Sequence, residues 1–229
     1  MTTAATVLSA APFAVPDGGA NPVSLLLLLA GMSVLPFLLV TFTSFTKISV
    51  VLSLTRSALG TQQAPPTMVL TGLAAVLSLL VMSPVAEAMV ARVRNERLPA
   101  VPGPELLHVV RSAAEPLRAF LVSHGNPELR SELAALSREL HGGAEVSETD
   151  LAVVAPAFVL SELKQAFQIG FLIFLPFLVV DMVVANVLLA LGMQSLSPSQ
   201  VSLPFKVLLF VAVDGWALLA RSLVQGYRA

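Results

Sequence analysis

Long apolar runs alternate with polar segments along this chain, and two apolar blocks stand out, at residues 22–87 and 151–229. Each block is long enough for two helices that cross a membrane. Residues 88–150 between them hold 16 of the 27 charged side chains, and residues 1–21 precede the first block as a tail. No alternation typical of strands is apparent. The pattern predicts an all-α, polytopic membrane-type protein, with two apolar helical hairpins around a hydrophilic, mostly helical insert.

Charged residues are expected to separate the apolar runs. In the first block, a loop is expected to hold Lys47, Arg56 and the turn-forming sequence GTQQAPP at 60–66. In the last block, Asp181 and Lys206 are expected to interrupt the helices. These positions define the helical segments of each hairpin.

The expected orientation of the chain in the membrane follows from the positions of its Lys and Arg residues. The loop with Lys47 and Arg56 has no acidic residue, which favours the cytoplasmic side for this loop. The insert at 88–150 is then expected on the periplasmic side of a bacterial inner membrane. Arg221 and Arg228 would then lie outside, against the rule. The tail lacks the basic region of a cleaved signal peptide, so the first apolar segment is expected to remain as an anchor.

Composition narrows the function further. Hydrophobic residues make up 56% of the chain and charged residues 12%, with a mean hydropathy of +0.85. A net charge of −1 gives no basic surface for nucleic acid. The chain has no cysteine, no phosphate-binding loop and no zinc or hydrolase motif, and His108, His124 and His141 lack ligand spacing. We therefore expect no catalytic, cofactor or metal site, and solvated histidines.

Six charged side chains lie inside or against apolar runs, where a charge is costly and normally faces protein or water. They are Lys47, Glu162, Lys164, Asp181, Lys206 and Asp214. Three roles compete: an ion path, pairing within a subunit and pairing between subunits. For Lys47 and Lys164, an equal alternative is that each lies at a helix end and extends its ammonium group to the membrane surface.

Glu162 and Lys206 are the best candidates for a defined pair, because an unpaired charge in either apolar context would be strongly unfavourable. The hypothesis is that they meet across a subunit boundary. Lys206 and Asp214 also share a helical face, so pairing toward Asp214 remains open.

Prolines recur in the apolar runs and predict kinked or broken helices. They lie at Pro36, Pro84, Pro156, Pro176, Pro198 and Pro204. Such breaks favour a multi-subunit wall, although ordinary proline kinks are an alternative. A flexible loop near 192–198 contains Met193, whose adaptable side chain suits a pore constriction, although the local sequence by itself favours a plain inter-helix turn.

Several sequence blocks resemble the FliP family, called SctR or YscR in injectisomes, in the order of that family. They are TSFTKI at 43–48, ALGTQQ at 58–63, VMSP at 81–84, PAFVLSEL at 156–163, the run 177–193, VSLPFK at 201–206 and VDGW at 213–216. The short insert and absent signal peptide make the injectisome branch the expected one.

The resemblance implies a homopentamer that assembles with SctS-like and SctT-like subunits into a helical export gate, beside SctU-like and SctV-like components. Unfolded substrates would pass through its centre, and the helices would sit largely above the membrane plane. It also implies that Met193 forms a gasket. A solute or ion transporter that uses the intramembrane carboxylates is the alternative, and a passive scaffold is a third; no repeated broken-helix pair supports the transporter.

Overall fold

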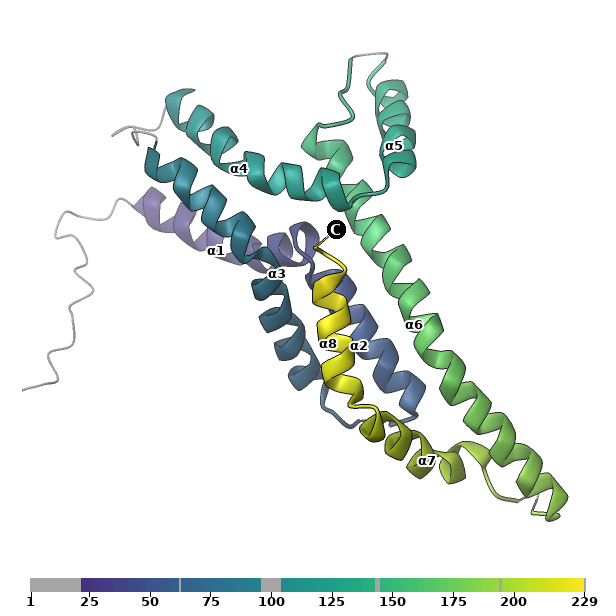
Figure 1. Cartoon of the computed structure of the whole chain (residues 1–229). Helices are drawn as coiled ribbons and strands as arrows, with labels where there is room; N and C mark the ends of the chain where they lie inside the picture. Colours follow the sequence, from purple (N-terminus) through teal and green to yellow (C-terminus); the bar gives the residue numbers. More distant parts are fainter. Residues whose placement is uncertain (1–21, 62, 96–103, 143–144, 194, 229) are drawn as a thin grey trace, which may run out of the picture. The chain divides into compact units, whose positions relative to one another are not determined.

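The computed structural model describes residues 22–61, 63–95, 104–142, 145–193 and 195–228. These residues form helices joined by turns and include no strand, so the predicted all-α class is confirmed. The helices are α1 (Pro22–Phe42), α2 (Phe45–Leu59), α3 (Thr67–Asn95), α4 (Pro104–His124), α5 (Pro127–Leu140), α6 (Leu151–Ala190), α7 (Pro198–Ala212) and α8 (Gly215–Gln225) (Figure 1).

The chain divides into two compact units, one ending at Leu38 and the other beginning at Leu39. The first contains most of α1, a helix without charged residues that has Pro36 in its interior. The second contains the last turn of α1 and the helices α2 to α8. The charged side chains discussed below all belong to the second unit.

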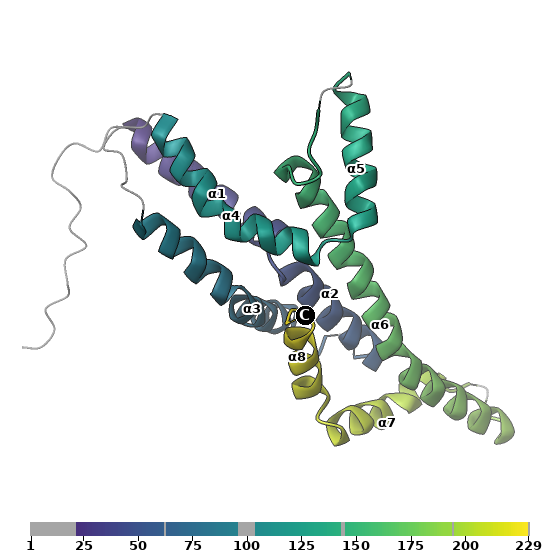
Figure 2. The same ribbon diagram turned by 45° about the horizontal axis from the view of Figure 1, so that its top comes forward.

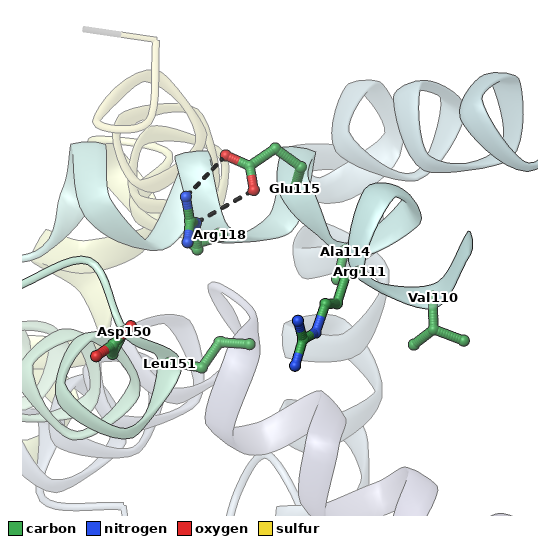
Figure 3. A pocket seen from close by; sticks show the side chains of 7 residues that line it. All are labelled: Val110, Arg111, Ala114, Glu115, Arg118, Asp150 and Leu151. Carbon is green, nitrogen blue, oxygen red and sulfur yellow. Dashed lines mark hydrogen bonds and ion pairs between the residues drawn. The ribbon is translucent and has the colours of Figure 1, made fainter. Parts of the chain in front are cut away.

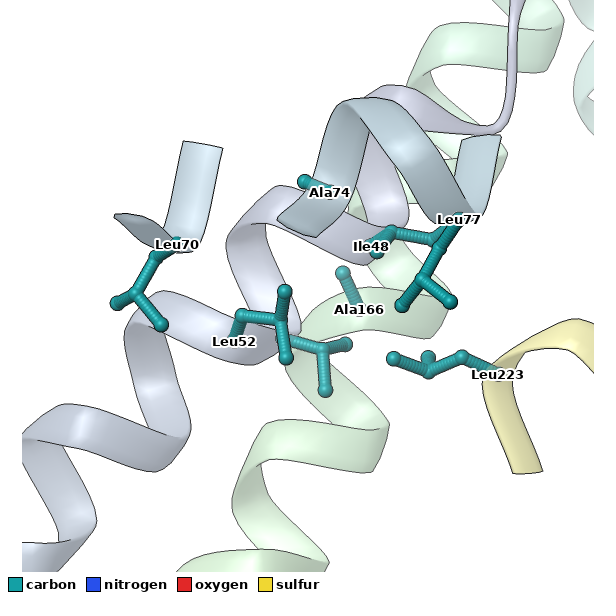
Figure 4. Close-up of a cluster of buried hydrophobic side chains, with 8 residues drawn as sticks. Ile48, Leu52, Leu70, Ala74, Leu77, Ala166 and Leu223 are labelled. Atoms are coloured by element: carbon teal, nitrogen blue, oxygen red, sulfur yellow. The ribbon is translucent and has the colours of Figure 1, made fainter. Parts of the chain in front are cut away.

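Helix α2 is the centre of the second unit and packs against both α3 and α6 (Figure 2). Its apolar side chains recur at helical spacing, so they form one stripe along the helix. That stripe meets α3, α6 and the end of α8 in one buried cluster (Figure 4). The cluster contains Ile48, Val51, Leu52, Leu70, Ala74, Leu77, Ala166 and Leu223. Packing on α2 therefore brings together elements far apart in the sequence.

The insert continues the helical packing. Helix α4 packs against α3 and α6 through Phe120 and Leu121, which meet Phe158 in a second buried cluster. Helix α5 begins where the Asn126 side chain accepts hydrogen bonds from two backbone N–H groups, as an N-cap does. Because α3 runs on to Asn95, the boundary expected at residue 87 lies inside a helix.

Three expected interruptions are absent, and those expectations were wrong. One of them is at Lys206, which lies within α7. Lys47 and Arg56 lie within α2 rather than in a loop, whereas the described residues of the expected turn, 60–61 and 63–66, are not helical. Helix α6 runs through Asp181 for 40 residues, about 60 Å at 1.5 Å per residue. Lys47, Asp181 and Lys206 have charged partners within the protein, so none of them needs a loop that would expose it to water.

The predicted broken helices are confirmed, but the breaks do not fall at prolines. The end of α1 and α2 are bent by 83° at Thr43–Ser44, and α7 and α8 by 59° at Val213–Asp214. Pro84, for example, lies inside the uninterrupted α3. By length and composition, α3 and α6 are each able to cross a membrane, and each bent pair adds one more span if it is counted as one.

Candidate functional site: two buried ion pairs and an interhelical loop

The first ion pair joins the start of α2 to α6. Lys47 Nζ lies 3.1 Å from Glu162 Oε1 and donates a second hydrogen bond of 3.0 Å to Gln165 Oε1. The carboxylate and the amide lie three residues apart, so they share one face of α6. Glu162 is fully buried and Lys47 is 4% exposed. A charge at such depth is tolerated because its partners replace water.

Tyr227, just beyond the end of α8, completes this group. Its hydroxyl donates a hydrogen bond to Glu162 Oε2, and its ring centroid lies 3.8 Å from Lys47 Nζ, a cation–π distance. Burial raises the pKa of the Tyr227 hydroxyl, and the negative charge of Glu162 raises it further. We name Lys47, Glu162, Gln165 and Tyr227 the Lys47 cluster. It ties α2, α6 and the end of α8 together.

The histidine nearest this cluster differs from expectation. His108 and His141 are exposed, as expected, but His124 is half-buried with its ring centroid 5.2 Å from that of Tyr227. Its Nε2 is buried without a hydrogen-bond partner among the described residues. The expectation of three solvated histidines was therefore wrong for His124, because packing of α4 against α6 and the chain end covers it.

The second ion pair joins α6, α7 and α2. Lys206 Nζ lies 2.6 Å from Asp181 Oδ2, and the Ser202 hydroxyl donates to the other oxygen of the same carboxylate. Lys206 Nζ also lies 3.5 Å from the Ala58 carbonyl oxygen at the end of α2. Lys206 is buried and Asp181 is half-buried. We name Asp181, Ser202 and Lys206 the Asp181 clamp.

The structure gives Glu162 and Lys206 separate partners. Within one chain, Glu162 pairs with Lys47 and Lys206 pairs with Asp181, so the two candidates do not meet each other. Both charges are already neutralised inside the subunit. A contact between them across a subunit boundary remains a prediction.

The two other charged candidates lie at the surface of the single chain. Lys164 is exposed on α6, and Asp214 is exposed at the break between α7 and α8. Asp214 has φ 50° and ψ 49°, a left-handed conformation that asparagine and aspartate adopt more readily than most residues. Their burial within an assembly remains a prediction.

A hydrogen-bonded hydroxyl group occupies the break between α1 and α2. Ser44 is fully buried and its hydroxyl donates to Ser78 Oγ at 3.1 Å, and Ser78 in turn donates to Thr43 Oγ1 at 3.2 Å. The backbone N–H of Phe45 also donates to Thr43 Oγ1. These bonds link the bend to α3 and satisfy polar groups that the helix break exposes.

The interhelical loop connects α6, which ends at Ala190, to α7, which begins at Pro198. Gly192 has φ +74°, a left-handed value that glycine adopts without strain. Met193 follows and is 48% exposed. The loop therefore presents a flexible apolar side chain at the surface of the single chain, and its role in a constriction remains a prediction.

A surface hollow lies elsewhere, between α4 and the start of α6 (Figure 3). It has a volume of about 450 Å³ and contains Arg111, Arg118, Glu115 and Asp150 among its lining residues. Glu115 and Arg118 pair with each other at 3.2 Å. The balanced charges include none of the predicted site residues. Within the described ranges, no three metal-ligating side chains converge.

Sequence reasoning missed three members of these networks, namely Gln165, Ser202 and Tyr227. Gln165 and Ser202 are ordinary polar residues whose role appears only when helices pack. Tyr227 offered one clue, because it is the only tyrosine of the chain. Buried tyrosine hydroxyls usually have a hydrogen-bond partner.

Comparison with known proteins points to one family. The family model described as "FliP family" matches residues 28–223. The hypersensitivity response secretion protein HrcR of Ralstonia nicotianae is 43% identical over 90% of this chain and 97% of its own length. The flagellar biosynthetic protein FliP of Pectobacterium carotovorum is 46% identical, over 93% of this chain and 82% of its own. FliP of Bacillus subtilis is 41% identical, over 93% and 95%.

Proposed function

Because the chain belongs to the FliP family, we propose that it is a core subunit of an export gate and lines the pore through which unfolded proteins cross the inner membrane. Family membership makes it an inner-membrane component of a type III secretion or flagellar export apparatus. The injectisome branch is the proposed one, on the short insert. Pore formation and substrate passage are the further steps of the proposal.

The observation that carries the proposal is that the two helices flanking the loop with Met193 are held to each other. The loop joins two apolar helices, and the Asp181 clamp ties those helices together. This ion pair holds its groups in one geometry, because separating them would leave the buried Lys206 ammonium without solvent or partner. A loop that is held rigidly at its base and carries a flexible Met193 side chain suits a pore constriction that widens around a passing chain and then closes.

The length of α6 supports an assembly in which helices extend beyond the bilayer. At about 60 Å, this helix is roughly twice the 30 Å thickness of a hydrocarbon core. Many of its large apolar side chains are exposed in the single chain, among them Phe167, Phe171 and Leu172. Exposed apolar surface of that extent needs lipid or other subunits as a cover.

The proposed partners follow from the family. They are further copies of the chain, in a homopentamer, SctS-like and SctT-like gate subunits, SctU-like and SctV-like components, and unfolded substrates. The exposed face of α6 is the surface available for lateral contacts.

A periplasmic location of residues 88–150 belongs to the same proposal. Lys47 no longer supports it, because this residue is buried in an ion pair. Arg56 still does, since its guanidinium donates to the Pro65 carbonyl and Thr67 Oγ1 at the α2–α3 turn. A cation at a turn without acids favours the cytoplasmic side.

The alternative, a solute or ion transporter, needs carboxylates that are free to bind and release a cation. Glu162 and Asp181 each hold a lysine ammonium within the chain. This arrangement weighs against transport through these groups.

The experiment that tests the proposal is the native mass of the detergent-extracted protein, alone and co-expressed with the SctS-like and SctT-like proteins. We expect a ring of several copies that gains both partners. A monomer or dimer that ignores them would overturn the proposal and favour the transporter.

A further inference from the structure

The C-terminal end of α8 has one polar anchor. Among the described residues, Tyr227 makes the only side-chain hydrogen bond between 215–228 and the rest of the chain. Leu223 is buried in the α2–α3–α6 cluster, while Arg221 and Gln225 are exposed. The position of this helix end therefore depends on a few apolar contacts and on Tyr227.

The anchor acts on the most deeply buried charges of the unit. The Tyr227 hydroxyl occupies one oxygen of Glu162, and Lys47 occupies the other. The Tyr227 ring also lies over the Lys47 ammonium and beside the rings of Phe120 and His124. If Tyr227 moved away, it would expose the Lys47–Glu162 ion pair, whose carboxylate is fully buried. Leaving is unfavourable for that reason.

The other end of this helical pair has its own anchor. Helices α7 and α8 follow the interhelical loop, and Lys206 of α7 is held in the Asp181 clamp. Tyr227 fixes the far end of the pair on the same helix, α6. Two polar anchors on α6, at Glu162 and at Asp181, thus set where α7 and α8 lie.

We propose that Tyr227 is a latch, a positioning residue whose hydrogen bond to Glu162 holds the end of α8 over the Lys47–Glu162 ion pair. The latch keeps α7 and α8 on α6 and thereby fixes the base of the loop with Met193. Its importance for export rests on the proposed function; its effect on α8 does not.

The chain provides its own probe for opening of the latch. Trypsin cleavage after Arg221 releases residues 222–229, or 222–228 where Arg228 is also cut, and both products count as release. A cleavage site inside a helix requires local unfolding. The rate of release is measured by mass spectrometry on the full-length protein in detergent. Cleavage after Arg118, within α4, is followed in the same samples as a measure of general loosening.

Tyr227→Phe keeps the ring and removes the hydroxyl. We expect release of 222–229 to be about tenfold faster, which corresponds to the loss of one hydrogen bond to a charged group. Cleavage after Arg118 should stay unchanged. Tyr227→Ala should accelerate release further, and the exposed control Gln225→Ala should leave it unchanged. Equal release from wild type and Tyr227→Phe, or equal acceleration at both sites, would overturn the latch.

The role in export has a separate readout. We expect Tyr227→Phe to lower secretion of a reporter substrate severalfold while the native mass of the assembled complex stays the same. Unchanged secretion by a variant with accelerated release would overturn the link to export. A strain that lacks this protein and still secretes would instead overturn the proposed function, and would leave the latch intact.

Discussion

At the scale of single residues, the deepest charges of this protein are each held by several kinds of contact. The Lys47 ammonium meets a carboxylate, an amide oxygen and the face of a tyrosine ring. Each contact replaces part of the hydration that burial removes, and none of them is strong enough to do so alone. The result is a cluster in which the loss of one member leaves a buried charge of another member without full compensation.

We expect Lys47→Met to lower the free energy of unfolding by about 3–5 kcal/mol, because Glu162 would keep a buried charge without its ammonium. Lys47→Met combined with Glu162→Leu should recover much of that loss, since no charge remains buried. Denaturant unfolding in detergent measures both variants. The matched control is Arg118→Ala, which breaks a half-exposed pair and should change stability by less than about 1 kcal/mol. A double variant as unstable as the single one would contradict this account.

The pH dependence of Tyr227 is a second test at this scale. A free tyrosine ionises with a pKa of about 10, and the pKa of Tyr227 is raised by burial and by Glu162. The contribution of this residue to stability is therefore complete below about pH 10 and is lost as pH rises above it, because only the unfolded chain then releases the proton.

Ultraviolet absorbance of the phenolate measures this directly, since the chain has one tyrosine. We expect the folded protein to show no phenolate at a pH where the denaturant-unfolded protein shows it fully. Coincident titration curves for the two states would show that Tyr227 is exposed.

At the scale of helices, the bends depend on local chemistry rather than on proline. The bend between α7 and α8 combines the left-handed Asp214 with close packing at Gly215. A Cβ atom at Gly215 would lie 2.3 Å from the Phe210 ring, which is buried and in edge contact with Trp216. The small residue therefore allows α8 to fold back onto the ring of α7.

We expect Gly215→Ala to destabilise the protein by about 1–3 kcal/mol, because the Phe210 ring would have to move within a packed site. Emission from Trp216, the only tryptophan, should change with it. The control Gly72→Ala lies in open space on α3 and should stabilise the protein slightly, by about 0.5–1 kcal/mol. Equal effects of the two substitutions would argue against close packing at Gly215.

At the scale of the whole molecule, the single chain leaves a large apolar surface uncovered. Its helices satisfy their buried charges internally, yet much of the apolar surface of α6 and α7 is exposed. Phe205 and Leu208 on α7 belong to this surface, as does Met193 in the loop. A soluble protein rarely exposes so much apolar surface, and a membrane assembly covers it with lipid and neighbouring subunits.

We expect Met193→Ala to raise the leakage of small solutes through the assembled gate without preventing assembly, because a shorter side chain narrows the constriction less. Single-channel conductance in a planar bilayer measures this effect. Met182→Ala, at an exposed position of α6 away from the loop, is the matched control. Unchanged conductance in Met193→Ala would contradict a gasket role for this residue.

Sequence and structure contribute different parts of this account. Composition and the lengths of the apolar runs were enough to predict helices and a membrane protein, because burial of apolar surface and backbone satisfaction in lipid act on every segment by itself. The prolines predicted broken helices, but the bends lie elsewhere, at 43–44 and 213–214. The sequence also identified the unusual charges at Lys47, Glu162, Asp181 and Lys206. It did not identify their partners; Lys47 and Glu162, for example, lie 115 residues apart along the chain.

Only the tertiary structure decided which charge meets which. Pairing depends on the faces that α2, α6, α7 and the chain end present to one another, and this is a property of packing rather than of spacing. For the same reason Asp181 does not break α6, since its charge is neutralised by Lys206. Tyr227 gained its role in the same way, because the fold brings the end of the chain to a carboxylate that has no access to water.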